Sequence, residues 1–384
     1  MPSSRAPRID VVGAGPGGLI CARILQRHGA AVTVHDLDTS ATARDQGGSL
    51  DMHPGTGQHA LKEAGLWDAF APLSRPEGQQ IRVADRHGRL LLDAAPPEEG
   101  DGADVRPEID RGRLRHLLLN SLSPGTVRWG HRLERAEPLG DGVHRLHFAD
   151  GSTTETDLVI GADGAWSRVR PLVSDARPDY TGVTVVEAEL LDADHRHPEL
   201  STFTGNGMMM AIDAGQGVIA QRNGEGRIRV HIALRTAEDW HRTAGADLAD
   251  PAAVRAVLLA RFSDWGAPLL AFLRAADTGY VNRPLYALPV PHTWRPTAGV
   301  TLLGDAAHLM SPISGMGANL AMRDGADLAH ALLDHVTTDA AVAAYEKVLF
   351  PRSAEAAQGA AAGLADLFSP DGAAHVLAHM SGEE

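Results

Sequence analysis

The sequence predicts an α/β protein: a doubly wound domain, an inserted and mostly antiparallel β-sheet domain, and a C-terminal helix. Three observations carry this prediction. A glycine-rich turn stands between an apolar strand and an apolar helix near the N-terminus. Residues 183–234 alternate in the manner of antiparallel strands, and another buried strand follows at 300–303. The region after Ala318 is rich in alanine and has a helical pattern.

The first turn has the spacing of a dinucleotide-binding motif. Its glycines are Gly13, Gly15, Gly17 and Gly18. Gly13 permits a tight turn, and Gly15 permits the close approach of a pyrophosphate. Gly18 permits the helix to pack closely on the strand. A second strand ends at Asp36, where an acceptor for a ribose hydroxyl belongs. The order favours a Rossmann-like domain over a glycine turn in another kind of α/β protein.

Composition narrows the class of protein. The chain has 384 residues, enough for two domains, of which 43% are hydrophobic and 22% charged. A formal net charge of -14 argues against a nucleic-acid partner. The chain has a single cysteine, Cys21, so it can form no internal disulfide, which fits a protein of the reducing cytoplasm. We expect Cys21 to be a small residue of the core. We expect no signal peptide and no membrane span. We also expect no metal site, because no cysteines or carboxylates stand at ligand spacing from His195 and His197.

The remaining pattern gives the order of elements and the domain boundaries. We predict a loop at 41–57, a hairpin of 81–84 with 90–92, and strands at 127–129, 143–148 and 158–160. Helices are predicted at 59–65, 111–122 and 251–275, and in the tail with breaks at Pro351 and Pro370. We expect the first domain to comprise residues 1–175 and a return segment at 281–340. The sheet domain is expected at 176–280, and a helical segment at 341–384 is expected to bridge the two domains.

Two further strands end in glycine and aspartate. The strand at 158–160 leads into Asp163 and Gly164, and the strand at 300–303 leads into Asp305. Ligands bind at the carboxyl ends of strands in doubly wound folds. Taken alone, each motif also fits a turn capped by aspartate or the start of a helix. The third motif continues through Pro312, Gly315, Gly317 and Asn319.

Together the three motifs resemble the single-component FAD-dependent aromatic hydroxylases of the para-hydroxybenzoate hydroxylase type. Within that family, segments 47–53, 107–111 and 304–310 are most similar to the tetracycline-inactivating monooxygenases. The resemblance implies that the motifs bind FAD, and that Gly48, Asp51 and Arg111 contact it as well. It also implies that Arg44 lies near the nicotinamide donor.

The resemblance implies the chemistry too. NAD(P)H reduces FAD, O2 adds to the reduced flavin, and a C4a-hydroperoxyflavin transfers one oxygen atom. Both hydroxylation and Baeyer–Villiger insertion stay open. The flavin carries the reaction, so no residue of the protein is expected to be catalytic, and His308 is expected to pack beneath the flavin loop. The alternatives are an FAD-dependent reductase or dehydrogenase without oxygen transfer, and a flavin-binding protein that is not an enzyme.

The substrate side departs from the tetracycline-inactivating enzymes, which leaves tetracycline itself open. We expect an aromatic or polyketide-like small molecule, with Glu187, Arg229, Met208 and Met210 near it and Pro312 and Gly315 at the flavin loop. Alternate residues of a strand face opposite sides, so one or two methionines could line the cavity, or pack in the core. Glu187 and Arg229 could form an ion pair or orient a phenol or enol.

Overall fold

A computed structural model describes residues 6–97, 105–370 and 372–381. It contains two compact units. Unit 1 comprises Met1–Ser74, Arg111–Asp179 and Tyr286–Ala360, and unit 2 comprises Arg75–Asp110, Tyr180–Leu285 and Ala361–Glu384. The expected boundaries placed residues 75–110 in the first domain, whereas the structure groups them in unit 2. The reason is that strand β4 (Ile81–Ala84) pairs in parallel with β13 (Met208–Asp213) of the unit 2 sheet.

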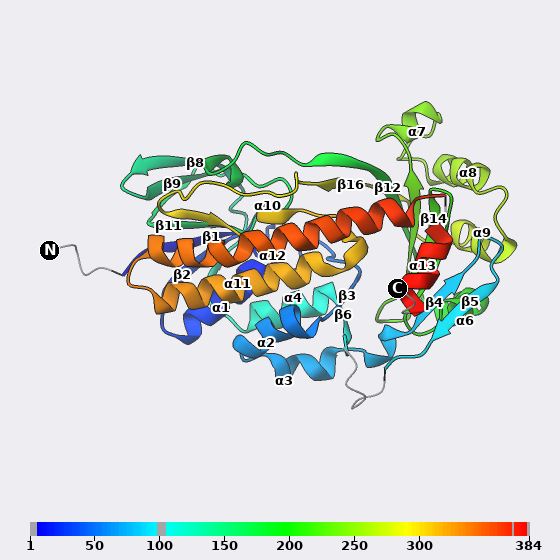
Figure 1. Ribbon diagram of the computed structural model, residues 1–384, viewed down its shortest axis with the longest axis horizontal. Helices are drawn as coiled ribbons and strands as arrows, with labels where there is room; N and C mark the ends of the chain where they lie inside the picture. The colour runs from blue at the N-terminus through cyan, green and yellow to red at the C-terminus, as the bar shows by residue number, and fades with distance from the viewer. Residues whose placement is uncertain (1–5, 98–104, 371, 382–384) are drawn as a thin grey trace. The chain divides into compact units, whose positions relative to one another are not determined.

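Unit 1 is built on a parallel sheet of five strands in the order β17-β11-β1-β2-β7 (Figure 1). The central strand β1 (Ile9–Val12) pairs in parallel with β11 on one side and β2 on the other. The four residues of β1 are buried, as a strand covered on both faces requires. The other strands are β2 (Val32–His35), β7 (Val127–Arg128), β11 (Leu158–Gly161) and β17 (Val300–Leu302).

Helices α1 (Pro16–Arg27) and α11 (Met316–Asp334) lie side by side against this sheet (Figure 1). Small residues permit their close approach, because a Cβ at Gly17 would lie 2.4 Å from the Ala321 carbonyl oxygen. The other elements wholly within unit 1 are β3 (Ser49–Asp51), α2 (His59–Glu63), α3 (Trp67–Phe70), α4 (Arg111–Asn120), β8 (Leu133–Gly140), β9 (Val143–Phe148), β10 (Thr153–Thr156) and α10 (Asp305–His308).

Unit 2 contains a sheet of seven strands in the order β16-β12-β15-β14-β13-β4-β5. Four of its pairings are antiparallel, as the alternating pattern predicts. One face of the sheet is buried against helices α8 and α9 through Val230, Leu258 and Phe272. The remaining elements are β5 (Leu90–Ala94), β6 (Glu108–Asp110), β12 (Asp179–Leu190), β14 (Gln216–Arg222), β15 (Ile228–Arg235), α7 (Trp240–Thr243), α8 (Pro251–Arg261), α9 (Ala267–Arg274), β16 (Val281–Ala287) and α13 (Gly372–Ser381).

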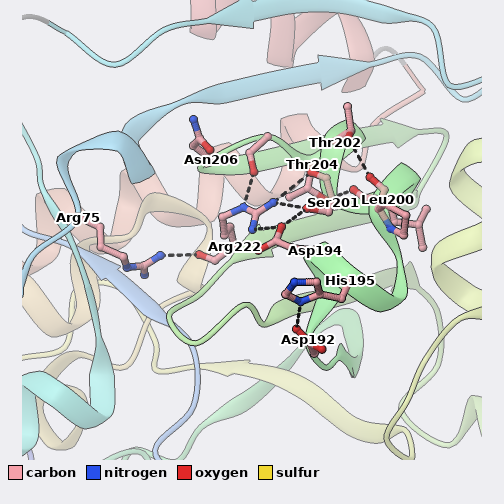
Figure 2. A network of polar contacts seen from close by, with 12 residues as sticks. Arg75, Asp192, Asp194, His195, Leu200, Ser201, Thr202, Thr204, Asn206 and Arg222 are labelled. Atoms are coloured by element: carbon pink, nitrogen blue, oxygen red, sulfur yellow. Dashed lines mark hydrogen bonds and ion pairs between the residues drawn. The ribbon is translucent and has the colours of Figure 1, made fainter.

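Two short helices interrupt the segment predicted as continuous sheet. They are α5 (Ala193–Arg196) and α6 (Pro198–Thr204). Figure 2 shows how the guanidinium of Arg222, at the end of β14, holds both. Its Nη1 donates to Asp194 Oδ1 at 2.9 Å and its Nη2 to Ser201 Oγ at 2.6 Å. These contacts are long-range, so the local pattern gave no sign of the helices.

Two predictions about helices are wrong. Residues 251–275 were expected to form one helix, but they form two, α8 and α9. The chain between these helices contacts the β4–β5 hairpin, where Gly266 N donates to the Arg86 carbonyl at 2.8 Å. Helix α12 (Thr338–Leu367) continues through Pro351 instead of breaking there. Tertiary contacts hold it on both sides, since Tyr345 donates to the Leu302 carbonyl and Arg352 pairs with Asp324. No helix of the described part of the chain is long and apolar enough to cross a bilayer.

Candidate functional site

The three predicted motifs follow three adjacent strands of unit 1. The glycine turn follows β1, the Asp163 turn follows β11, and the Asp305 turn follows β17. Because these strands are parallel neighbours, their carboxyl ends lie at one edge of the sheet. The first two turns touch there: a Cβ at Gly13 would lie 2.2 Å from the Ala162 carbonyl oxygen. The structure therefore brings the three motifs together.

Arg170 ties the second motif to the third. Its side chain is buried, with 3% of the residue exposed. Its Nε donates to the Ala306 carbonyl and its Nη2 donates to the Ala165 carbonyl, both at 2.8 Å. Burial lowers the pKa of Arg170 from its usual value, against the attraction of Asp163 and Asp305.

The glycine turn leaves room for a ligand at one position. A Cβ at Gly15 would find no atom within 4 Å, whereas a Cβ at Gly18 would lie 2.4 Å from the Gly13 carbonyl oxygen. Helix α1 begins directly after Gly15, with no side-chain cap on its first N–H groups. Uncapped N–H groups and the positive end of the helix dipole are what a phosphate binds. The open space therefore fits a pyrophosphate.

Asp36 is engaged with backbone next to that turn. Its Oδ2 accepts from Ala14 N at 2.7 Å and its Oδ1 from Asp38 N at 2.8 Å. A carboxylate has about four acceptor positions, so a ribose hydroxyl can still donate to it. Arg115 pairs with Asp38 at 3.0 Å and donates to the Ala14 carbonyl at 3.3 Å. The exposed Arg44 reaches the same Asp38 oxygen at 3.0 Å.

Arg115 is a residue that sequence reasoning missed as part of the site. It is the second arginine of the Arg-x-x-Leu-Arg pattern in which Arg111 was singled out. Arg115 is buried and holds the glycine turn against Asp38, whereas Arg111 is exposed. The apolar spacing of α4 contained the signal, since Arg115 stands three residues before the buried Leu118, and residues three apart share a helix face.

Asn319 joins the 51–57 segment to the start of α11. It is fully buried, its Oδ1 accepts from His53 N at 3.0 Å, and its Nδ2 donates to the Asp51 carbonyl at 2.7 Å. Gly315 has a φ of +65°, and a Cβ there would lie 3.0 Å from Asp51 Oδ1. Asp51, Gly315 and Asn319 are therefore neighbours. Gly48 lies three residues before Asp51, and its carbonyl accepts from Arg111 N at 3.0 Å.

Burial raises the pKa of both motif carboxyls. For Asp163, burial outweighs hydrogen bonds from Ser167 and from the backbone of Arg168 and Val169. Its Oδ1 is buried and has no protein partner among the residues that the structure describes. For Asp305, burial outweighs the attraction of His308, Arg111 and Arg170. A Cβ at Gly317 would lie 3.8 Å from Asp305 Oδ1, so this carboxyl lies at the start of α11.

The last predicted cofactor positions differ in their surroundings. Gly164 has a φ of +77° and open space where a Cβ would be. Pro312 is exposed and begins a short 3-10 turn at Pro312–Ser314. As predicted, Cys21 is buried, and burial raises the pKa of its thiol to about 12. Within the described ranges, no three His, Cys, Asp or Glu side chains gather in a way that could hold a metal ion.

The four other substrate candidates belong to unit 2. Of the two alternatives for Glu187 and Arg229, the ion pair between them is not formed, because each pairs with another residue. The register of β12 and β15 places Arg229 opposite Glu189, with which it pairs. Glu187 lies opposite His231 and pairs with Arg283 at 3.2 Å. Met210 packs on Val83 in a small apolar cluster, with Met208 against it.

Comparison with known proteins gives the family. A family model described as an FAD binding domain matches residues 7–359. The monooxygenase asqM of Emericella nidulans is 30% identical, with 92% of this chain and 90% of that protein covered. The 3-amino-4-hydroxybenzoate 2-monooxygenase PtnB3 of Streptomyces platensis is 31% identical, covering 92% of this chain and 86% of that protein. The tetracycline destructase Tet(55) has a similar fold, with a TM-score of 0.70, 22% identity, and 92% and 88% of the two chains covered.

Proposed function

Since the chain belongs to the family of FAD-dependent monooxygenases, we propose that it uses NAD(P)H and O2 to transfer one oxygen atom to an aromatic or polyketide-like small molecule. The observation that carries the proposal is the meeting of the three glycine and aspartate turns at one edge of the unit 1 sheet. The relative PtnB3, whose name gives an aminohydroxybenzoate as its substrate, supports an aromatic substrate.

The residues at this edge fit FAD. Open space at Gly15 and the uncapped start of α1 suit its pyrophosphate. Asp36 is proposed to accept from the ribose, and Asp305 with Gly315 and Gly317 to bind the ribityl and phosphate side. The buried Asp163 Oδ1, which has no protein partner in the described chain, is proposed to face the cofactor. Bound FAD supplies the redox chemistry with O2, and the protein supplies position and exclusion of water.

The donor and substrate contacts are the finer part of the proposal. Arg44 is exposed and held by Asp38, which suits a residue that meets a transiently bound NAD(P)H. In unit 2, Glu187, Arg229, Met208 and Met210 are proposed as substrate contacts. In unit 1, Pro312 and Gly315 of the flavin loop are proposed as further candidates. The single cysteine, which allows no internal disulfide, supports a location in the reducing cytoplasm.

The test measures cofactor, donor and product together. The purified protein is expected to release FAD, and to oxidise NADH or NADPH faster with one member of a panel of hydroxybenzoates, aminohydroxybenzoates and polycyclic phenols. Under oxygen-18 gas the product should gain one labelled oxygen atom, and its NMR spectrum separates hydroxylation from Baeyer–Villiger insertion. Donor oxidation that yields a product without labelled oxygen would establish a reductase. A protein that cannot be loaded with FAD would refute the proposal.

A further inference from the structure

The turn that carries Asp305 is held by a buried carboxylate of α11. Asp324 is fully buried, and its Oδ2 accepts from Gly304 N at 3.0 Å. His308 Nε2, at the end of α10, lies 2.6 Å from the same oxygen. One oxygen atom therefore fixes both the residue before Asp305 and the last residue of its short helix.

The carboxylate is itself held by α12. Arg352 Nη2 donates to Asp324 Oδ1 at 2.9 Å, and Arg352 Nη1 donates to Asp327 Oδ2 at 2.6 Å. The pair of His308 and Asp324 is thus connected to a long helix rather than to a surface loop. A carboxylate held on both oxygens keeps a defined position.

The charges around His308 favour its protonated form. Burial opposes that form, but attraction to Asp324 and to Asp305 outweighs it, so the pKa of His308 is raised. Asp324 has its pKa lowered, because His308 and Arg352 outweigh its burial. The cationic groups that face this region from other elements are Arg352 on α12 and, on the side of Asp305, Arg111 and Arg170.

The second ring nitrogen of His308 makes no hydrogen bond within the described chain. Its Nδ1 is buried and has no hydrogen-bond partner among the described residues. His308 also lines a small cavity of about 10 Å³, together with His292 and Ser353. That volume suits about one water molecule.

We propose that the ion pair of His308 and Asp324 positions the Gly304–Asp305 turn for FAD. The proposal rests on the proposed FAD site, and it adds two positioning residues that act through Gly304 and Asp305. As pH rises through the raised pKa of His308, the attraction within the pair is lost. FAD affinity should therefore fall as pH rises through that pKa.

The experiment measures the Kd for FAD by flavin fluorescence from about pH 6 to about pH 10. We expect His308→Gln and Asp324→Asn each to raise the Kd about tenfold or more, since each leaves a buried partner unpaired. The double variant should raise it less than the product of the two factors. His308→Gln should also lose the fall with rising pH that the wild type shows. If Asp324→Asn does not fold, Arg352→Lys tests the same carboxylate and should give a smaller rise.

His197→Gln is the matched control. His197 Nε2 lies 2.9 Å from Asp277 Oδ2, and both residues belong to unit 2, so the substitution removes a similar pair outside the unit that carries the FAD motifs. Its Kd for FAD should equal that of the wild type. Wild-type affinity in both His308→Gln and Asp324→Asn, or a fall with rising pH that persists in His308→Gln, would overturn the inference. A wild type without FAD would instead refute the proposed function.

Discussion

Arg170 Nη2 donates to the main-chain carbonyl of Asp305 at 3.2 Å. The residue that follows the second motif therefore holds the residue that defines the third. The same guanidinium also serves the carbonyls of Ala165 and Ala306. A planar group with five donors can satisfy three carbonyls in fixed directions, which a lysine ammonium cannot do with the same geometry.

Replacement of Arg170 should weaken unit 1 and the FAD site together. We expect Arg170→Lys to lower the free energy of unfolding by about 2 kcal/mol, because buried carbonyls lose charge-assisted partners. Urea unfolding of the protein without FAD gives that number, and fluorescence titration gives the Kd. The exposed neighbour Arg168, changed to lysine, is the control and should change neither. A fully stable Arg170→Lys protein with normal FAD affinity would contradict the role of Arg170.

Substitution of Gly15 should affect FAD binding, whereas substitution of Gly17 should affect the stability of the fold. Gly15→Val adds atoms to open space, so we expect normal stability without FAD and a loss of FAD binding. Gly17→Ala places a Cβ 2.4 Å from the Ala321 carbonyl oxygen, and should lower the free energy of unfolding by about 1–3 kcal/mol. Thermal unfolding without FAD and FAD titration separate the two effects. A Gly15→Val protein that binds FAD normally would show that the pyrophosphate does not approach there.

Glu187 and Glu189 of β12 should couple to different partners. A double-mutant cycle of Glu189→Gln with Arg229→Met should give a coupling free energy of about 1 kcal/mol, since both side chains are more than four-fifths buried. Glu187 with Arg283 should give about half or less, because Arg283 is 59% exposed. The cycle of Glu187 with Arg229 should give a value near zero. A strong coupling there would contradict the register of β12 and β15.

A buried carboxyl in unit 1 should make stability depend on pH. Burial raises the pKa of Glu346, although Trp294 Nε1 and Thr301 Oγ1 both donate to its Oε1 at 2.8 Å. The native state therefore holds a proton more tightly than the unfolded state, and this group adds stability as pH falls towards its ordinary pKa. Glu346→Gln should be more stable at pH 8 by on the order of 1 kcal/mol and lack this pH dependence.

The control for this prediction lies on the same helix. Glu355 is exposed on α12, so Glu355→Gln should follow the wild type at every pH. The measurement is urea unfolding across the pH range. A Glu346→Gln protein that loses stability at pH 8 would mean that the charged carboxylate stabilises the fold.

The sequence predicted what depends on local pattern and missed what depends on distant partners. The strand, glycine turn and helix around Gly13 were predictable because each follows from neighbouring residues. The Arg170 clamp was not, since its acceptors at Asp305 and Ala306 lie 135 and 136 residues away. The partner of Arg229 depended on a strand register that composition does not encode. Helix α12 passes Pro351 because contacts at Tyr345 and Arg352 hold it.

The most direct test of the central claim is a crystal structure of the protein with FAD bound. We predict that the pyrophosphate lies at Gly15 and the start of α1, and that Asp163 and Asp305 both line the same cofactor. Electron density for FAD that touches only one of the three turns, or that lies elsewhere, would contradict the claim.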